Sequence, residues 1–164
     1  MNQKKAVSAV VATVLIIMIT VAAVAIIWTA IMPMVRNSIQ KGNACFDAQS
    51  DVAIGIDSGR TCLNSSADNG NGTVYVQVKK GASDKFALVG LDVSVSVAGN
   101  SYSERIKEEY LPGNNEDRVV NVTGTVLKHN ISMADRVKIA PIVSIGNTEE
   151  ICDVSQEVIL TPCR

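Results

Sequence analysis

Hydrophobic and polar positions divide this chain into two very different parts. A short leader that contains Lys4 and Lys5 runs into 30 residues, Ala6 to Val35, without an Asp, Glu, Lys, Arg or His. As a helix rising about 1.5 Å per residue this run is about 45 Å long, whereas a bilayer core is about 30 Å thick. The pattern therefore predicts one helix that can span a membrane with about ten residues to spare.

Beyond residue 45 the pattern changes to an alternation of apolar and polar residues. The clearest run is Leu91–Val97, which places apolar residues on one face and Asp or Ser on the other. Strands are predicted over residues 51–57, 73–79, 91–97, 103–108, 118–127, 137–145 and 158–160, separated by turns rich in Gly, Asn and Pro. Seven short strands at this spacing predict an antiparallel β-sandwich of immunoglobulin-like size, so the fold class is α+β.

Charge and composition restrict the partners of the polar part. All 16 acidic residues lie beyond residue 35 with 13 of the 15 basic ones, which gives that part a formal charge of −3. Binding of nucleic acid requires a clustered basic face, so we expect no nucleic-acid partner. Aromatic residues are few, so the core must consist mainly of Val, Ile, Leu and Ala.

Catalytic and cofactor chemistry has little support. The single histidine is His129, and no pair of nucleophile and base is recognisable in the sequence. One histidine and four cysteines without C-x-x-C spacing do not make a usual zinc site. We therefore expect neither an enzyme nor a bound cofactor or metal, and we interpret His129 as an exposed loop residue.

Four cysteines, Cys45, Cys62, Cys152 and Cys163, form an even set that predicts two disulfides in one of three pairings. The alternative is four buried thiols that act as small hydrophobic side chains. Among the pairings we slightly favour neighbours in sequence, Cys45–Cys62 with Cys152–Cys163. A pairing of Cys45 or Cys62 with the C-terminal segment would instead fasten the last strand to the base of the domain.

Four N-x-[ST] triplets, at Asn64, Asn71, Asn121 and Asn130, are potential N-glycosylation sites. Together with paired cysteines they indicate an extracellular domain. If Asn121 is modified, it must lie on the solvent face of its strand, with Val120 and Val122 facing inward.

Two acidic segments are candidates for calcium binding. Asp68–Thr73 resembles a calcium loop at its start, but Lys79 stands where the bidentate glutamate is required. A hairpin turn before the strand at Thr73 is the better interpretation. Glu108, Glu109, Glu116 and Asp117 flank the loop around Pro112, and we interpret them as a solvated acidic loop because no calcium template fits.

The apolar run has three interpretations. A cleaved secretory signal would use Ala23–Ala25 as its cleavage site, but the run continues for ten more residues. An uncleaved anchor is the second interpretation. In the third, the helix is stored in the membrane and later packs against copies of itself.

Small residues within the run favour the third interpretation. They occur at i, i+4 spacing, which lets helix backbones approach closely in an apolar environment. The pairs are Ser8 with Ala12, Ala9 with Thr13, and Ala25 with Thr29. Val, Ile, Leu and Met fill the other faces, so the helix is apolar all round.

The segment from Lys4 to Leu15 resembles the class III signal peptide of archaeal type IV pilins, and residues 19–28 are also similar to members of that family. The resemblance covers about the first 35 residues closely and the rest in outline. Two positions differ: Ala9 stands where many relatives have proline, and Val11 where bacterial pilins have glutamate. The resemblance implies cleavage by a prepilin peptidase between Ala6 and Val7, with Lys4, Lys5 and Ala6 recognised.

The resemblance also implies a leader over residues 1–6, an assembly and transmembrane helix over 7–42, and an extracellular head over 43–164. Pro33 is expected to kink the helix, which then continues through Lys41 and ends at Gly42. Lys4 and Lys5 are expected to stay on the cytoplasmic side while the head is exported.

The expected function is that of a structural subunit in an extracellular pilus used for adhesion or surface contact. Its partners would be identical subunits, the prepilin peptidase, the membrane assembly platform and, before assembly, the membrane. Two alternatives stay open. One is a membrane-anchored extracellular binding module that does not polymerise. The other is a minor pilin, a pseudopilin or an archaellum subunit.

Overall fold

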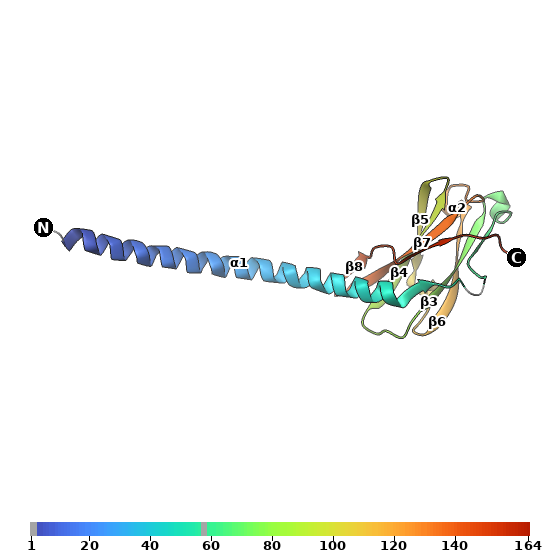
Figure 1. The fold of residues 1–164 in the computed structure, drawn as a ribbon. Helices are drawn as coiled ribbons and strands as arrows, with labels where there is room; N and C mark the ends of the chain where they lie inside the picture. The colour runs from blue at the N-terminus through green and yellow to red at the C-terminus, as the bar shows by residue number, and fades with distance from the viewer. Residues whose placement is uncertain (1–2, 57–58) are drawn as a thin grey trace. The chain divides into compact units, whose positions relative to one another are not determined.

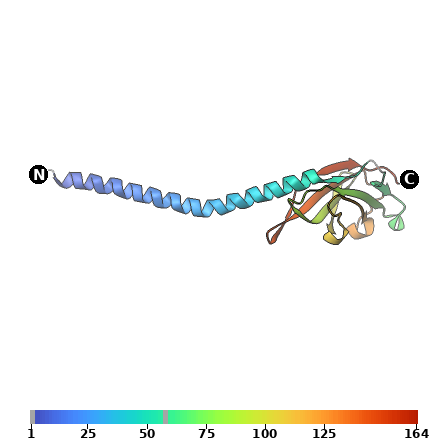
Figure 2. The ribbon, with the colours of Figure 1, turned by 90° about the horizontal axis from the view of Figure 1, so that it is seen from below.

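The computed structural model describes residues 3–56 and 59–164 and, in α1, side chains from Val10 onward. The chain forms two compact units, Met1–Gln40 and Lys41–Arg164, which we call the rod and the head. Figures 1 and 2 show that the first element, α1, is one uninterrupted coil. This helix supplies the whole described rod and the first turns of the head.

Helix α1 extends over Gln3–Asp51 and contains Pro33 in its interior. The run that forms it is rich in Ala, Val and Ile and contains no glycine before Gly42. Such an apolar run without glycine favours a helix. Within the helix every backbone group is hydrogen-bonded, except the groups at the two ends and the one carbonyl that lacks a donor because Pro33 has no N–H. The prediction of a long apolar N-terminal helix is confirmed.

The predicted helix end at Gly42 is wrong, since α1 continues to Asp51. A glycine in a helix interior costs only about 1 kcal/mol. The residues after it gain more than that by packing: Ala48 is fully buried, and Ala44 and Cys45 pack against the core of the head. Tertiary packing therefore overrides the local stop signal, and Lys41 forms an ion pair with Glu150 rather than lying in a last turn.

Two antiparallel sheets make up most of the head. The first contains β1 (Val52–Ile54), β2 (Cys62–Asn64), β3 (Thr73–Lys80) and β6 (Glu116–Thr123). Strand β3 pairs with β6 along one edge, and with β1 and β2, end to end, along the other.

The second sheet has the same plan around a different strand. It contains β4 (Ala87–Val97), β5 (Asn100–Lys107), β7 (Arg136–Ile145), β8 (Thr148–Ile151) and β9 (Gln156–Ile159). Strand β4 lies between β5 and β7, and the far edge of β7 carries β8 and β9 in succession. Short helical turns are η1 (Asp68–Gly70), η2 (Glu108–Tyr110) and α2 (Gly124–Leu127).

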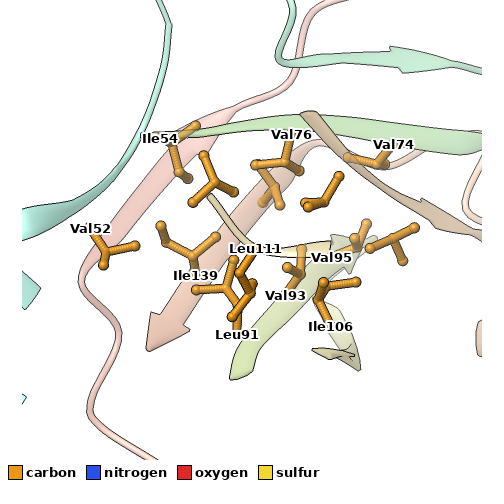
Figure 3. Close-up of a cluster of buried hydrophobic side chains, with 14 of the residues drawn as sticks. Val52, Ile54, Val74, Val76, Leu91, Val93, Val95, Ile106, Leu111 and Ile139 are labelled. Carbon is orange, nitrogen blue, oxygen red and sulfur yellow. The ribbon is translucent and has the colours of Figure 1, made fainter. Parts of the chain in front are cut away.

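The core of the head lies between these sheets. Val74 and Val76 of the first sheet face Leu91, Val93 and Val95 of the second in Figure 3. All five side chains have no exposed surface. Their alternation along β3 and β4 is the period-two pattern of the sequence, so the apolar faces of two strands distant in sequence form one core. As expected from the composition, the largest fully buried side chains are Leu, Ile and Val.

The antiparallel sheets confirm the α+β class, whereas an immunoglobulin-like sandwich is not confirmed. The strand predicted over residues 118–127 ends at Thr123. There the Thr123 hydroxyl accepts a hydrogen bond from the Val126 amide and caps α2. Gly124 permits the turn, because a Cβ would lie 2.6 Å from the Asn71 carbonyl oxygen. Strands β2 and β8 were not predicted.

Two disulfides are confirmed, but the favoured pairing is wrong. Cys45 is bonded to Cys152 and Cys62 to Cys163. Both bonds join positions early in the head to positions late in it, because α1 packs beside the segment after β8 and the C-terminal segment lies along β2. The Leu63 amide donates to the Thr161 carbonyl, and the Cys163 amide donates to the Leu63 carbonyl.

Loss of either disulfide should destabilise the head strongly. The bonds join residues 107 and 101 positions apart, and closing a loop of about 100 residues is worth up to about 4.7 kcal/mol in the chain-entropy model. The paired change Cys45→Ala with Cys152→Ala should lower the thermal midpoint without leaving a free thiol. Peptide mapping without reductant tests the pairing, and a Cys45–Cys62 peptide would contradict it.

Replacement of Ala98 by Asn should stabilise the head by about 0.5–1 kcal/mol. Ala98 and Gly99 form the two-residue turn between β4 and β5 and have φ angles of 49° and 86°. This left-handed backbone suits Asn-Gly and disfavours an alanine. Denaturant unfolding measures the change. The matched variant Gly99→Ala should destabilise, and equal stability of all three proteins would contradict the argument.

Candidate functional site

The side chains of the rod are the largest apolar feature of the described chain. Every residue from Val10 to Gln40 is exposed except the half-buried Met32. Large aliphatic side chains are included, with Ile19 and Ile26 each 67% exposed. The helix is long and apolar enough to cross a membrane. A surface of this kind requires an apolar environment, supplied either by lipid or by other helices.

Hydroxyl groups within the rod are satisfied by the helix itself. The Oγ1 atoms of Thr13, Thr20 and Thr29 donate to carbonyl oxygens three residues earlier, at 2.9–3.0 Å. Such bonds let a threonine lie in an apolar medium without an external partner. These threonine-to-carbonyl hydrogen bonds were not predicted from the sequence. The isolated threonines in the apolar run were the pattern that could have indicated them.

The predicted packing residues Ala12, Thr13, Ala25 and Thr29 all lie exposed on α1. Ala25 and Thr29, one turn apart, share a face of the helix. Ser8 and Ala9 are in α1, but their side chains lie outside the described ones. The same holds for the predicted cleavage segment, Lys4, Lys5, Ala6 and Val7. Cleavage and helix packing therefore stay predictions.

Within the head, the last turns of α1 are held by β8 and the segment that follows it. The Lys41 ammonium lies 2.6 Å from the Glu150 carboxylate, and the Gln49 side-chain amide donates to the Asp153 carbonyl at 3.0 Å. The Cys45–Cys152 bond lies between these two contacts in the sequence. Three contacts of different chemistry therefore join the end of α1 to β8 and to the connection between β8 and β9.

The four predicted glycosylation sites differ in accessibility. Asn121 and Asn130 are exposed, whereas Asn64 and Asn71 are half-buried. Val120 and Val122 are buried at 4% and 0% exposure, so β6 has the alternation that an acceptor at Asn121 requires. Asn121 and Asn130 are the better candidates, and modification stays a prediction.

The two acidic segments have their own protein partners. Strands β2 and β3 form the expected hairpin, and in its loop the Asp68 carboxylate accepts from the amide and hydroxyl of Thr125. Glu116 accepts from the Gly113 amide and from Arg118. Among residues 3–56 and 59–164, no group of three or more potential metal-binding side chains was found.

His129 is exposed, and its ring lies 4.1 Å from the ring of Tyr102. The contact joins the end of α2 to β5. The interpretation of His129 as a surface residue agrees with this position, and its role in the described structure is packing against the tyrosine.

Carboxyl groups of the head fall into two classes. The hydrogen bond from Arg136 holds the pKa of Glu157 below its usual value, and that from the Gly113 amide does the same for Glu116. Burial instead raises the pKa of Glu104, and it raises that of Asp92 against an opposing hydrogen bond from Ser103. In the first class the folded head stabilises the ionised carboxylate, and in the second it favours the protonated carboxyl group.

Comparisons with protein-family models, with curated proteins and with solved structures find no match to this chain. The chemistry and geometry of its own residues therefore carry the functional argument.

Protonation of Glu157 should make the head less stable in acid. Because its pKa is lowered on folding, its contribution is present above its ordinary pKa and is lost as the pH falls through the lowered value. Glu157→Gln should reduce stability at about pH 7 and reduce the loss of stability on going to about pH 3. Urea midpoints at both pH values measure this, with Glu108→Gln as a control for an exposed carboxylate. An unchanged pH dependence in Glu157→Gln would contradict the assignment.

Proposed function

We propose that this chain is a structural subunit of an extracellular filament of the archaeal type IV pilus kind, used for adhesion or surface contact. The rod would wait in the membrane with the head outside, and then move into a shared apolar core of identical rods. On this proposal the chain has no catalytic activity. Its partners are its own copies, the prepilin peptidase and the membrane assembly platform.

The observation that carries the proposal is the exposed apolar surface of the rod. It continues beyond the length that a bilayer needs, and it is apolar on every side. An ordinary anchor requires only the spanning length, whereas a helix surrounded by copies of itself gains from apolar contacts along its whole length. The threonine hydroxyls bonded within the helix support burial without polar partners.

The head supports an extracellular location. Two disulfides persist in oxidising compartments, and two exposed sequons lie on its surface. Its two antiparallel sheets with one core are compatible with the expected β-sandwich, and the immunoglobulin-like assignment is part of this proposal. The choice between a major pilin, a minor pilin and an archaellum subunit depends on copy number and motility.

A membrane-anchored binding module that never polymerises is the second candidate. The same helix satisfies its requirement for one span. The two candidates differ in the fate of the rod, because an anchor remains in lipid and a pilin leaves it.

Electron microscopy and intact-mass analysis of material sheared from cells test the proposal together. We expect fibres that contain this chain, with an intact mass that corresponds to a chain beginning at Val7 together with any glycan. Reduction of both disulfides should raise this mass by that of four hydrogen atoms. Material found only in the membrane fraction, with Met1 or Asn2 retained, would support the anchor instead.

Variants in the rod separate assembly from anchoring. Ala25→Leu adds volume at a predicted close-packing position, whereas Val24→Leu makes a smaller change on another face of the same helix. Ala25→Leu should reduce the yield of fibres while the amount of protein in the membrane stays the same. Equal fibre yields for the two variants would contradict packing through Ala25.

A further inference from the structure

The head has a pocket where the two sheets leave edges open. Strand β5 pairs only with β4 and β6 only with β3 among the described strands, so each has an edge without a neighbouring strand. A pocket of about 190 Å³ is lined by residues of both strands and of η2, including Glu104, Arg118 and Tyr110. It lies wholly within the head.

Glu104 lines this pocket and is half-buried on the side of β5 that faces the core. Its neighbours Ser103 and Arg105 are exposed, and Ile106, two positions further on the same face, is buried. The Glu104 Oε2 atom is inaccessible to solvent and has no hydrogen-bond partner within the described structure. An acceptor in this state costs stability, so its retention at a core-facing position requires an explanation.

The cation in the same pocket does not neutralise Glu104. The Arg118 guanidinium donates to the Glu116 carboxylate at 3.1 Å and to the Glu109 carbonyl at 3.0 Å. With Arg118 paired to Glu116, Glu104 is the carboxylate of this pocket that lacks a cationic partner in the described structure. The pocket can therefore accept a positive charge.

The remaining walls are apolar. Ile106 and Val120 are buried at 7% and 4% exposure, whereas Tyr110 and Val119 are 58% and 41% exposed. Their apolar surfaces suit a short alkyl chain leading to the carboxylate. The pocket volume matches a small ligand of a few carbon atoms rather than a polymer.

We propose that this pocket binds a primary ammonium group on a short alkyl stem, such as a lysine side chain, with Glu104 as the acceptor. An ammonium group is compact and brings three donors, which fits one unpaired carboxylate better than the broad planar guanidinium does. The alkyl stem would contact Ile106 and Val120. Burial raises the pKa of Glu104, and a bound cation would favour the charged carboxylate. Binding of the ammonium group does not require the proposed filament, because the pocket lies wholly within the head.

Titration of the full chain in detergent micelles with n-butylammonium tests the proposal. Amide NMR signals of Glu104 and Asn121 should shift saturably at millimolar concentrations, and 1-pentanol, which has a similar stem without the charge, should not reproduce the shift. Glu104→Gln should weaken binding about tenfold or more, because it keeps the shape and removes the charge.

Two further variants keep the outcome interpretable. Glu109→Gln removes a nearby negative charge that does not line the pocket and should leave the affinity unchanged. Tyr110→Ala should weaken binding while the carboxylate remains. Absence of a saturable shift in the wild-type protein, or equal affinities of the wild type and Glu104→Gln, would overturn the proposal.

The source of the ammonium group is distinguished by carbodiimide cross-linking of assembled or membrane-bound protein. An amide between Glu104 and a lysine of another copy would assign the pocket to contacts between heads. Binding of n-butylammonium without such a cross-link would assign it to an external amine or a lysine of another protein.

Discussion

Exclusion of water from the rod is the constraint on which the rest of this molecule depends. A helix with aliphatic side chains on every face has no stable state alone in water, so its environment must be apolar throughout the life of the protein. This requirement explains why its threonines are bonded within the helix, and why no charged residue lies between Lys5 and Arg36. The head has its own core, whose described members all lie between Ala44 and Leu160.

The last turns of α1 are part of the head and pack against its core. Residues Ala44, Cys45 and Ala48 pack against the core, and the chain then enters the first sheet as β1. The disulfide at Cys45 leads instead to the second sheet, through the segment after β8. A helix joined to the head only by a peptide bond would be free to pivot at its last residue.

Sequence patterns were sufficient for elements whose pattern is local. The apolar run, the long strands β3, β4 and β7, and the turn at Ala98 were all recognisable because their periodicity or turn residues are contiguous. Strands β2 and β8 were missed because each is only three or four residues long and is fixed by a neighbour, not by its own alternation. The end of α1 and the disulfide pairing depend on contacts across about 100 residues, which spacing alone does not report.

The candidate sites show the same division. The sequence could link an exposed Asn121 to the alternation along β6, whereas the pocket at Glu104 depends on two open strand edges and on the pairing of Arg118 with Glu116. No motif in the sequence marks an acid as lacking a partner. That property exists only once the neighbours have been placed.

The cross-connection at the end of α1 has a mechanical consequence. Tension applied along the helix would enter the head by two covalent routes, through the backbone into β1 and through Cys45–Cys152 into the strands on the far edge of β7. The pull would be divided between both sheets, so that neither could be peeled away strand by strand while the sulfur bridge is intact. In a filament of the proposed kind, this division of load would help each subunit to resist shear.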